Sequence, residues 1–177
     1  MFDQRGELRH WAEDGGGSEN PATPSEWVRS KLGFEPDEMQ RRLLDLGSKR
    51  VILNCSRQWG KSTVTAAKAV HHACTNSDSM VLVVSPCLRQ SGEFLAKAEA
   101  FARRLGTPVR GDGKNRLSIR FENRSRVVGL PGNEATIRGF SKVSLLLIDE
   151  AARVEDELYL AMQLAPTEGD ARSRCWR

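Results

Sequence analysis

The chain has 177 residues, of which 39% are hydrophobic and 28% are charged, and its formal net charge is +4. This length fits one domain, with or without a tail, and the hydrophobic fraction excludes a wholly disordered chain. The longest purely aliphatic runs, 81–84 and 145–148, are far shorter than the roughly 20 apolar residues of a membrane-spanning helix, so the sequence predicts no such helix.

The cysteines and the first residues indicate a cellular compartment. The cysteines show no metal-type spacing, and the N-terminus has no basic stretch followed by an apolar one, so no secretory signal is predicted. We therefore expect reduced thiols in a cytoplasmic protein, at Cys55, Cys74, Cys87 and Cys175.

The charge is unevenly distributed. Residues 1–26 hold six acidic and two basic residues, whereas residues 103–126 hold eight basic and two acidic ones. The basic cluster could attract nucleic-acid phosphates, or it could be the solvated face of a hairpin.

The chain begins with a flexible acidic leader, predicted over residues 1–25, which contains a glycine run and two prolines. Apolar residues then recur at helical intervals over 26–46, with a break at 33–36. A buried strand is predicted at 51–53 and a helix at 61–74. The further expected elements are a strand at 80–84, a helix at 90–105, a hairpin of 116–121 and 126–130, a strand at 145–148 and a helix at 155–164.

Aliphatic strands that alternate with helices predict an α/β fold with a mostly parallel sheet covered by helices on both faces. We assign the domain to residues 26–164 and expect an irregular tail over 165–177.

The strongest motif follows the first predicted strand, over residues 55–63. It matches the phosphate-binding loop pattern G-x-x-x-x-G-K-[ST], except that Cys55 replaces the first glycine. Backbone N–H groups at such a strand-to-helix turn form an anion cradle, and a lysine and a hydroxyl after the glycine contact phosphate and Mg²⁺. The candidate nucleotide-binding residues are therefore Ser56, Arg57, Gly60, Lys61, Ser62 and Thr63, with Ser62 also a candidate Mg²⁺ ligand.

A second motif supports the first. The aliphatic strand 145–148 ends in Asp149 and Glu150, and acids at the carboxyl end of a parallel strand emerge where open α/β sheets bind ligands. Asp149 is expected to hold Mg²⁺, and Glu150 to orient or deprotonate the attacking water. Together the two motifs predict a nucleotide hydrolase core.

Gln40 bears on the choice of nucleotide. A glutamine amide can pair with N6 and N7 of adenine, and the sequence lacks the guanine-reading pattern Asn-Lys-x-Asp, so ATP is favoured over GTP. The alternative is an exposed helical glutamine.

Two arginines are candidates for stabilising charge in the transition state. Arg57 lies within the loop and would act in cis, whereas Arg138 lies in a glycine-bearing segment and could act on a neighbouring subunit. A structural role, or a contact with DNA phosphate, is an alternative for each.

These motifs occur in one order along the chain. The glutamine segment is followed by a loop of the form S-R-Q-x-G-K-S-T, strand 81–86 ahead of Arg89-Gln90-Ser91, Leu130-Pro131-Gly132, Ile137-Arg138-Gly139 and the segment 147–154. Together they resemble the N-terminal ATPase of the terminase large subunit of tailed bacteriophages, a DNA-packaging motor, over about residues 26–164.

The resemblance implies a RecA-like P-loop NTPase that uses ATP and Mg²⁺ to translocate double-stranded DNA. It implies a homo-oligomeric ring on a portal protein, a terminase small subunit as partner, and a phage or prophage product in the bacterial cytoplasm. By resemblance, Gln40 contacts adenine, Arg57 and Lys61 contact phosphate, Ser62 and Asp149 hold Mg²⁺, Glu150 is catalytic and Arg138 acts in trans.

The chain departs from the family after the acidic strand. Such proteins continue to a further strand, a coupling motif and a ribonuclease-H-like nuclease domain, whereas residues 165–177 are polar and hold no acid cluster. We therefore expect a domain that is incomplete at its C-terminus and has no nuclease activity. The alternatives to a packaging ATPase are a helicase-like RecA-fold ATPase and an inactive DNA-binding fragment.

Overall fold

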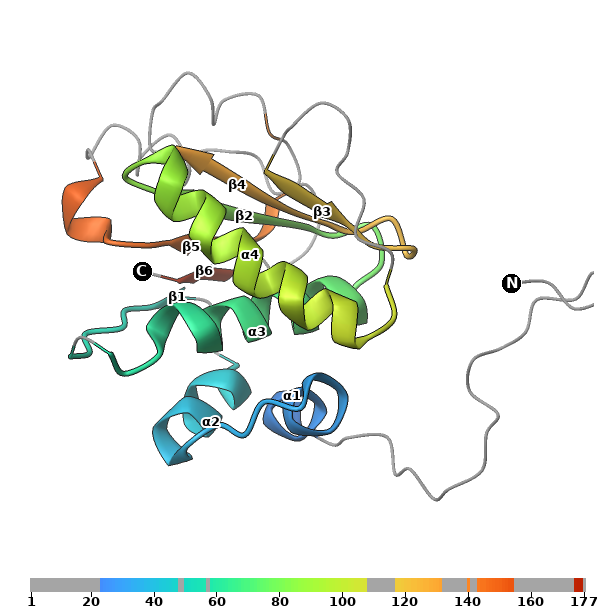
Figure 1. Ribbon diagram of the computed structural model, residues 1–177. Helices are drawn as coiled ribbons and strands as arrows, with labels where there is room; N and C mark the ends of the chain where they lie inside the picture. Colours follow the sequence, from blue (N-terminus) through green and yellow to red (C-terminus); the bar gives the residue numbers. More distant parts are fainter. Residues whose placement is uncertain are drawn as a thin grey trace, which may run out of the picture.

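The computed structural model describes residues 23–47, 50–56, 58–107, 117–131, 140, 143–154 and 174–176. These residues form a six-stranded sheet and four α-helices, which Figure 1 shows from one side. The predicted helix over 155–164 lies outside the described residues.

Two short helices precede the sheet. Helix α1 spans Pro24–Leu32 and helix α2 spans Glu38–Asp45, which confirms the predicted helical segment and its break. Each begins with a capping box, formed by Thr23 with Glu26 in α1 and by Asp37 with Gln40 in α2. Because α1 starts at Pro24, ordered structure begins within the predicted leader.

The sheet is mostly parallel, as predicted. Its strand order is β1-β6-β5-β2-β4-β3, and all pairs are parallel except β3 with β4, the predicted hairpin. The strands are β1 at Arg50–Val51, β2 at Met80–Ser85, β3 at Ser118–Arg120, β4 at Arg126–Pro131, β5 at Val143–Ile148 and β6 at Arg174–Trp176.

Two strands differ from the prediction. Strand β1 ends at Val51, and Ile52 is 74% exposed, so the expected buried strand at 51–53 is wrong. The reason is its place at the edge of the sheet, where β6 is its one hydrogen-bonded neighbour in the described structure. The expectation of an irregular tail over 165–177 did not include β6, which lies between β1 and β5.

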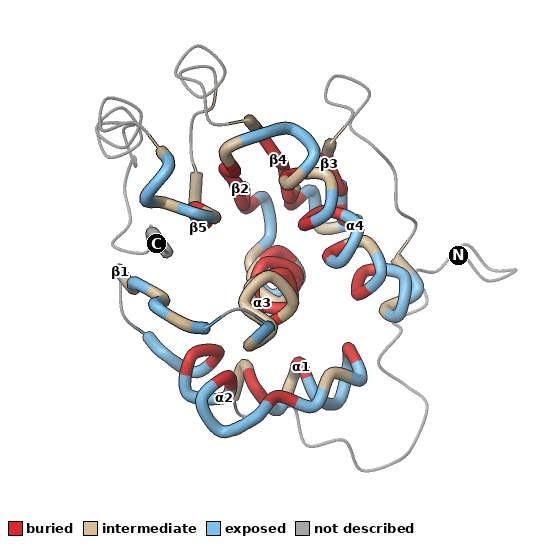
Figure 2. Tube along the Cα trace, turned by 60° about the vertical axis from the view of Figure 1, so that its left-hand side comes forward, coloured by how far each residue is buried: buried red, intermediate tan, exposed pale blue. Residues whose placement is uncertain are grey.

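Helix α3 spans Lys61–Thr75 and helix α4 spans Leu88–Arg104, close to the predicted bounds. The main core joins all four α-helices to one face of the sheet, and Figure 2 shows buried residues concentrated on α3 and the strands around it. The opposite face carries a second apolar cluster, formed by residues of β2, β4 and β5. Phe140, Val143, Ala151 and Val154 pack against it. The four described α-helices therefore cover one face.

Two arginines of the basic cluster are engaged within the protein. Arg104 donates to the carbonyl oxygen of Leu32 at 2.6 Å, and Arg124 pairs with Asp78 at 2.7 Å. These arginines join α4 to α1 and close a turn beside α3. Residues 108–116 of the cluster lie outside the described residues. Among the described helices, none has the length and apolar character needed to cross a membrane.

Candidate functional site

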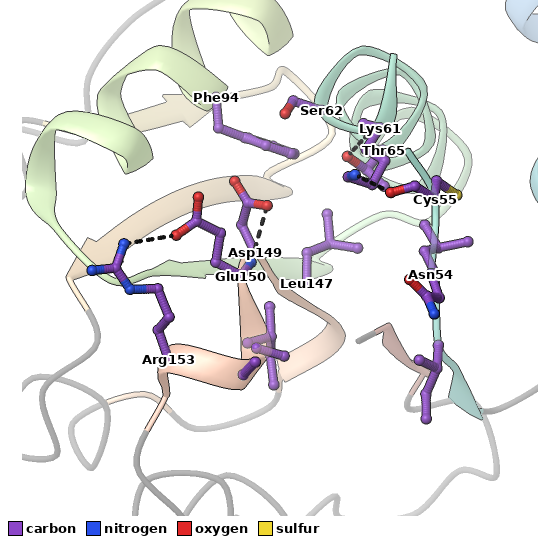
Figure 3. A pocket seen from close by; sticks show the side chains of 15 residues that line it. Asn54, Cys55, Lys61, Ser62, Thr65, Phe94, Leu147, Asp149, Glu150 and Arg153 are labelled. Carbon is purple, nitrogen blue, oxygen red and sulfur yellow. Dashed lines mark hydrogen bonds and ion pairs between the residues drawn. The ribbon is translucent and has the colours of Figure 1, made fainter. Parts of the chain in front are cut away.

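A cavity of about 700 Å³ opens at the carboxyl ends of β1 and β5 and the N-terminus of α3. Lys61 and Ser62 line it from α3, and Asp149 and Glu150 line it from the segment after β5. Figure 3 shows these side chains around one space, which Phe94 of α4 also lines. The structure thus brings together the two motifs that the sequence separates.

The loop before α3 turns through left-handed backbone. Gln58 has φ +65° and Gly60 has φ +88°, a conformation that glycine adopts without steric cost. Gly60 is the N-cap of α3, and no side chain caps this helix in the described structure. Free N–H groups at the start of a long helix form an anion site, so the geometry suits a phosphate.

Lys61 lies across the loop. Its Nζ donates to the carbonyl oxygen of Cys55 at 2.8 Å and to that of Ser56 at 3.1 Å. These contacts hold the ammonium group at the cavity, beside the N-terminus of α3. A polyanionic ligand would offer the ammonium group stronger, charge-assisted hydrogen bonds than two neutral carbonyls do.

Gln40 is a buried residue behind the loop. It is 8% exposed, its Nε2 donates to the carbonyl oxygen of Trp59 at 3.0 Å, and its Oε1 accepts from the backbone of Asp37 at 3.1 Å. A Cβ added at Gly60 would lie 3.1 Å from Gln40 Nε2. The alternative of an exposed helical glutamine is therefore wrong, and Gln40 fixes the loop against α2. Its contact with adenine stays a prediction.

The acidic pair is held at the end of β5. The backbone N–H of Asp149 donates to the carbonyl oxygen of Val84 at 2.8 Å, and its Oδ1 accepts from the backbone of Glu150 at 3.1 Å. Burial raises the pKa of Asp149, the charge of Glu150 raises it further, and the Glu150 N–H together with Lys61 and Lys97 lowers it in part. A nearby cation would stabilise the ionised form of a partly desolvated carboxylate of this kind.

The site suits Mg²⁺. Ser62 offers a hydroxyl oxygen and Asp149 a carboxylate, both line the same cavity, and Mg²⁺ prefers oxygen ligands from one or two carboxylates with phosphates and water. The raised pKa of Asp149 points the same way, because a cation would offset the cost of ionising it.

Glu150 has contacts with residues that the sequence did not single out as functional. Its backbone adopts φ +50°, its Oε1 accepts from Gln90 Nε2 at 3.1 Å and its Oε2 from Arg153 Nη1 at 3.3 Å. Arg153 belongs to the short 3₁₀ helix η1, Ala151–Arg153, and lines the cavity. Its spacing of three residues from Glu150 was a usable signal, whereas nothing in the sequence relates Gln90 to Glu150.

The other predicted site residues divide into two groups. Ser56 and Thr63 have described main-chain contacts in and after the loop, since Ser56 accepts from Lys61 and Thr63 donates to the carbonyl oxygen of Gly60. Arg57 and Arg138 lie outside the described residues, so their roles stay predictions. Thr65 lines the cavity and was not predicted.

The comparison with protein families decides the relationship. The model for the N-terminal part of terminase large subunits of the T4-like-virus type matches residues 52–172. The chain belongs to this family. A comparison with curated proteins gives no match.

Solved structures support the fold of this terminase chain. The ATPase domain of the large terminase of Thermus phage P74-26 is 20% identical, with a TM-score of 0.74 over 87% of this chain and 69% of that one. The large terminase of bacteriophage HK97 is 15% identical, with a TM-score of 0.69 over 87% of this chain and 37% of that one. The large terminase of a thermophilic bacteriophage, in complex with ATP-γ-S, is 14% identical, with a TM-score of 0.58 over 72% of this chain and 32% of that one.

These matches confirm the predicted α/β fold of the RecA-like P-loop type and the predicted relationship to terminase ATPase domains. The chain spans about a third of the length of the HK97 large terminase and of the thermophilic-phage large terminase.

Proposed function

We propose that the chain is the ATPase part of a phage DNA-packaging terminase, which hydrolyses ATP with Mg²⁺ to translocate double-stranded DNA. The observation that carries this proposal is a cavity that Lys61 and Ser62 line on one side and Asp149 and Glu150 on the other. Membership of the terminase large subunit family and the ATP-γ-S complex of the thermophilic-phage relative support it.

In this proposal the phosphates bind at the N-terminus of α3. Its N–H groups and Lys61 hold the β- and γ-phosphates, as helix N-termini and loop lysines do in other nucleotide sites. Ser62 and Asp149 would hold Mg²⁺, which when bound would neutralise phosphate charge. Gln40 would contact adenine from α2.

The hydrolytic water is assigned to Glu150. Its carboxylate lines the cavity after β5 and can orient the water or accept its proton. Arg153, which donates to Glu150, would add positive charge near the phosphates, and Arg57 and Arg138 would add more from the loop and from a neighbouring subunit.

We propose a homo-oligomeric ring as the working state, with a portal protein, a terminase small subunit and double-stranded DNA as partners in the cytoplasm of the bacterial host. The supporting observation is family membership. A helicase-like ATPase is less well supported, since the family match favours a packaging enzyme.

The test separates binding from hydrolysis. We expect Lys61→Ala to weaken Mg·ATP binding at least about 10-fold, because it removes a charge-assisted phosphate contact. Exposed Lys31 on α1 gives a matched control, and Lys31→Ala should leave the affinity unchanged. We expect Glu150→Gln to bind Mg·ATP while losing roughly 100-fold or more in turnover.

Isothermal titration calorimetry measures the affinity, and phosphate release measures the turnover. Unchanged affinity for Mg·ATP in Lys61→Ala would contradict the assignment of the loop as the phosphate site. Wild-type turnover in Glu150→Gln would contradict the assignment of Glu150 to the hydrolytic water.

A further inference from the structure

The side chain of Glu150 is held from two directions. Arg153 reaches Oε2 from three residues further along the chain, whereas Gln90 reaches Oε1 from helix α4, sixty residues away in sequence. The backbone of Glu150 has φ +50°, an uncommon conformation for a residue with a Cβ.

Helix α4 holds the backbone of Gln90 in place. Gln90 lies in the first turn, and the next residue, Ser91, is fully buried and donates its hydroxyl to the carbonyl oxygen of Leu130 at 2.8 Å. Gly129 lets this turn approach β4 closely, since a Cβ added there would lie 3.3 Å from Ser91 Cβ. The start of α4 is thus attached to the sheet beside β2 and β4.

The amide of Gln90 has a defined orientation. Cys87 Sγ donates to its Oε1 at 3.4 Å, which leaves Nε2 to donate to Glu150. A reversed amide would place its oxygen against the carboxylate, which has no proton to donate when ionised.

We infer that Gln90 is a positioning residue for Glu150, which fixes the carboxylate for its work on the hydrolytic water. The inference rests on the proposed function, because it assumes that Glu150 handles this water. An amide suits this role because it donates one hydrogen bond and adds no charge of its own beside the carboxylate. Arg153, by contrast, holds the same group with a cation that attracts the charge.

Steady-state ATP hydrolysis by the full chain tests this role. We expect Gln90→Ala to lower kcat about 10-fold or more, with KM for Mg·ATP changed less than about two-fold, because the contact serves the reacting water and not the nucleotide. Gln90→Glu, of the same shape, should lower kcat further, since it places a second negative charge beside Glu150. Glu93→Gln is the matched control: Glu93 lies one turn along α4, is exposed and pairs with Arg89, and we expect wild-type kcat.

A spectroscopic readout tests the contact without turnover. The NMR signals of the Gln90 side-chain amide are identified by their loss in Gln90→Ala. Their chemical shifts should change in Glu150→Gln, because the hydrogen bond to a carboxylate is replaced by one to a neutral amide. They should stay in place in Lys31→Ala.

Any of three results would overturn the inference. They are an unchanged kcat in Gln90→Ala, an equal loss of kcat in Glu93→Gln, and Gln90 amide signals that do not shift in Glu150→Gln. Failure of the proposed function looks different. In that case the wild-type chain binds no Mg·ATP, while the Gln90 signals still report whether the contact to Glu150 exists.

Discussion

The approach of α4 to the sheet can be tested with two glycines that respond in opposite directions to the same substitution. Gly129 lies in β4 beneath α4, and a Cβ there would lie 3.1 Å from Leu95 Cδ1 and 3.3 Å from both Leu95 Cγ and Ser91 Cβ. Gly92 lies within α4, and a Cβ there would meet Leu117 Cδ2 at an ordinary 3.8 Å.

The magnitudes follow from these distances. In Gly129→Ala, forcing a methyl group into a packed contact costs about 1–3 kcal/mol, and the lower entropy of the unfolded chain returns about 0.4–1 kcal/mol. Relief is limited because Leu95 is 5% exposed and Ser91 is bonded to Leu130. We expect a net loss of roughly 1–2 kcal/mol. Gly92→Ala gains about 0.5–1 kcal/mol of helix stability.

Thermal unfolding followed by circular dichroism measures both effects. At about 2–4 °C per kcal/mol for a chain of this size, Gly129→Ala should lower Tm by roughly 2–8 °C and Gly92→Ala should raise it by roughly 1–4 °C. If both substitutions raise Tm, α4 does not lie as close to β4 as described. The attachment of α4 to the sheet, which holds Gln90 in place, would then be contradicted as well.

Two further predictions concern α3. Burial raises the pKa of Cys74 to about 12, whereas Cys87 is exposed, so iodoacetamide at pH 8 should label Cys87 well before Cys74 unless denaturant is added, as peptide mass spectrometry would show. Because the unfolded thiol ionises near 9.0 and the folded one near 12, Cys74 should reduce stability as pH rises between these values; equal labelling of the two native thiols would contradict the burial. Asn123→Ala removes the donor to the carbonyl oxygens of Ala73 and Cys74, at 2.8 and 3.2 Å, and should lower stability by about 1–3 kcal/mol in urea unfolding. Glu122→Ala, at an exposed neighbour, is its control, and equal midpoints in the two variants would refute the reasoning.

The central strands could be predicted from the sequence because their environment leaves a local pattern. Strands β2 and β5 have buried residues on both faces of the sheet, so they appear as continuous aliphatic runs. Strand β6 has no such run, and the apolar run at 51–53 misled because β1 ends at Val51. Their positions follow from backbone pairing, as in the register of Arg50 with Cys175, and pairing between distant residues leaves no mark on local composition.

The candidate site shows the same division. Gly60, Lys61 and Asp149 were found because a loop or a strand end places each of them by local geometry. The contact of Gln90 with Glu150 depends on how α4 lies on the sheet, and the burial of Gln40 depends on how α2 lies on the loop. Tertiary packing decides both, so the residue pattern alone could not reveal them.

The place of β6 has a consequence for the order of assembly during synthesis. Strand β1 joins the sheet by pairing with β6, and β6 in turn pairs with β5. Helices α3 and α4 with β2, β4 and β5 can associate as soon as they leave the ribosome, but this pairing waits for residues 174–176. Pairings that close such long loops form slowly, so we expect the capacity to bind nucleotide to appear late, after most of the core has formed. A nascent chain that lacks these residues would have a compact core but could not yet bind nucleotide.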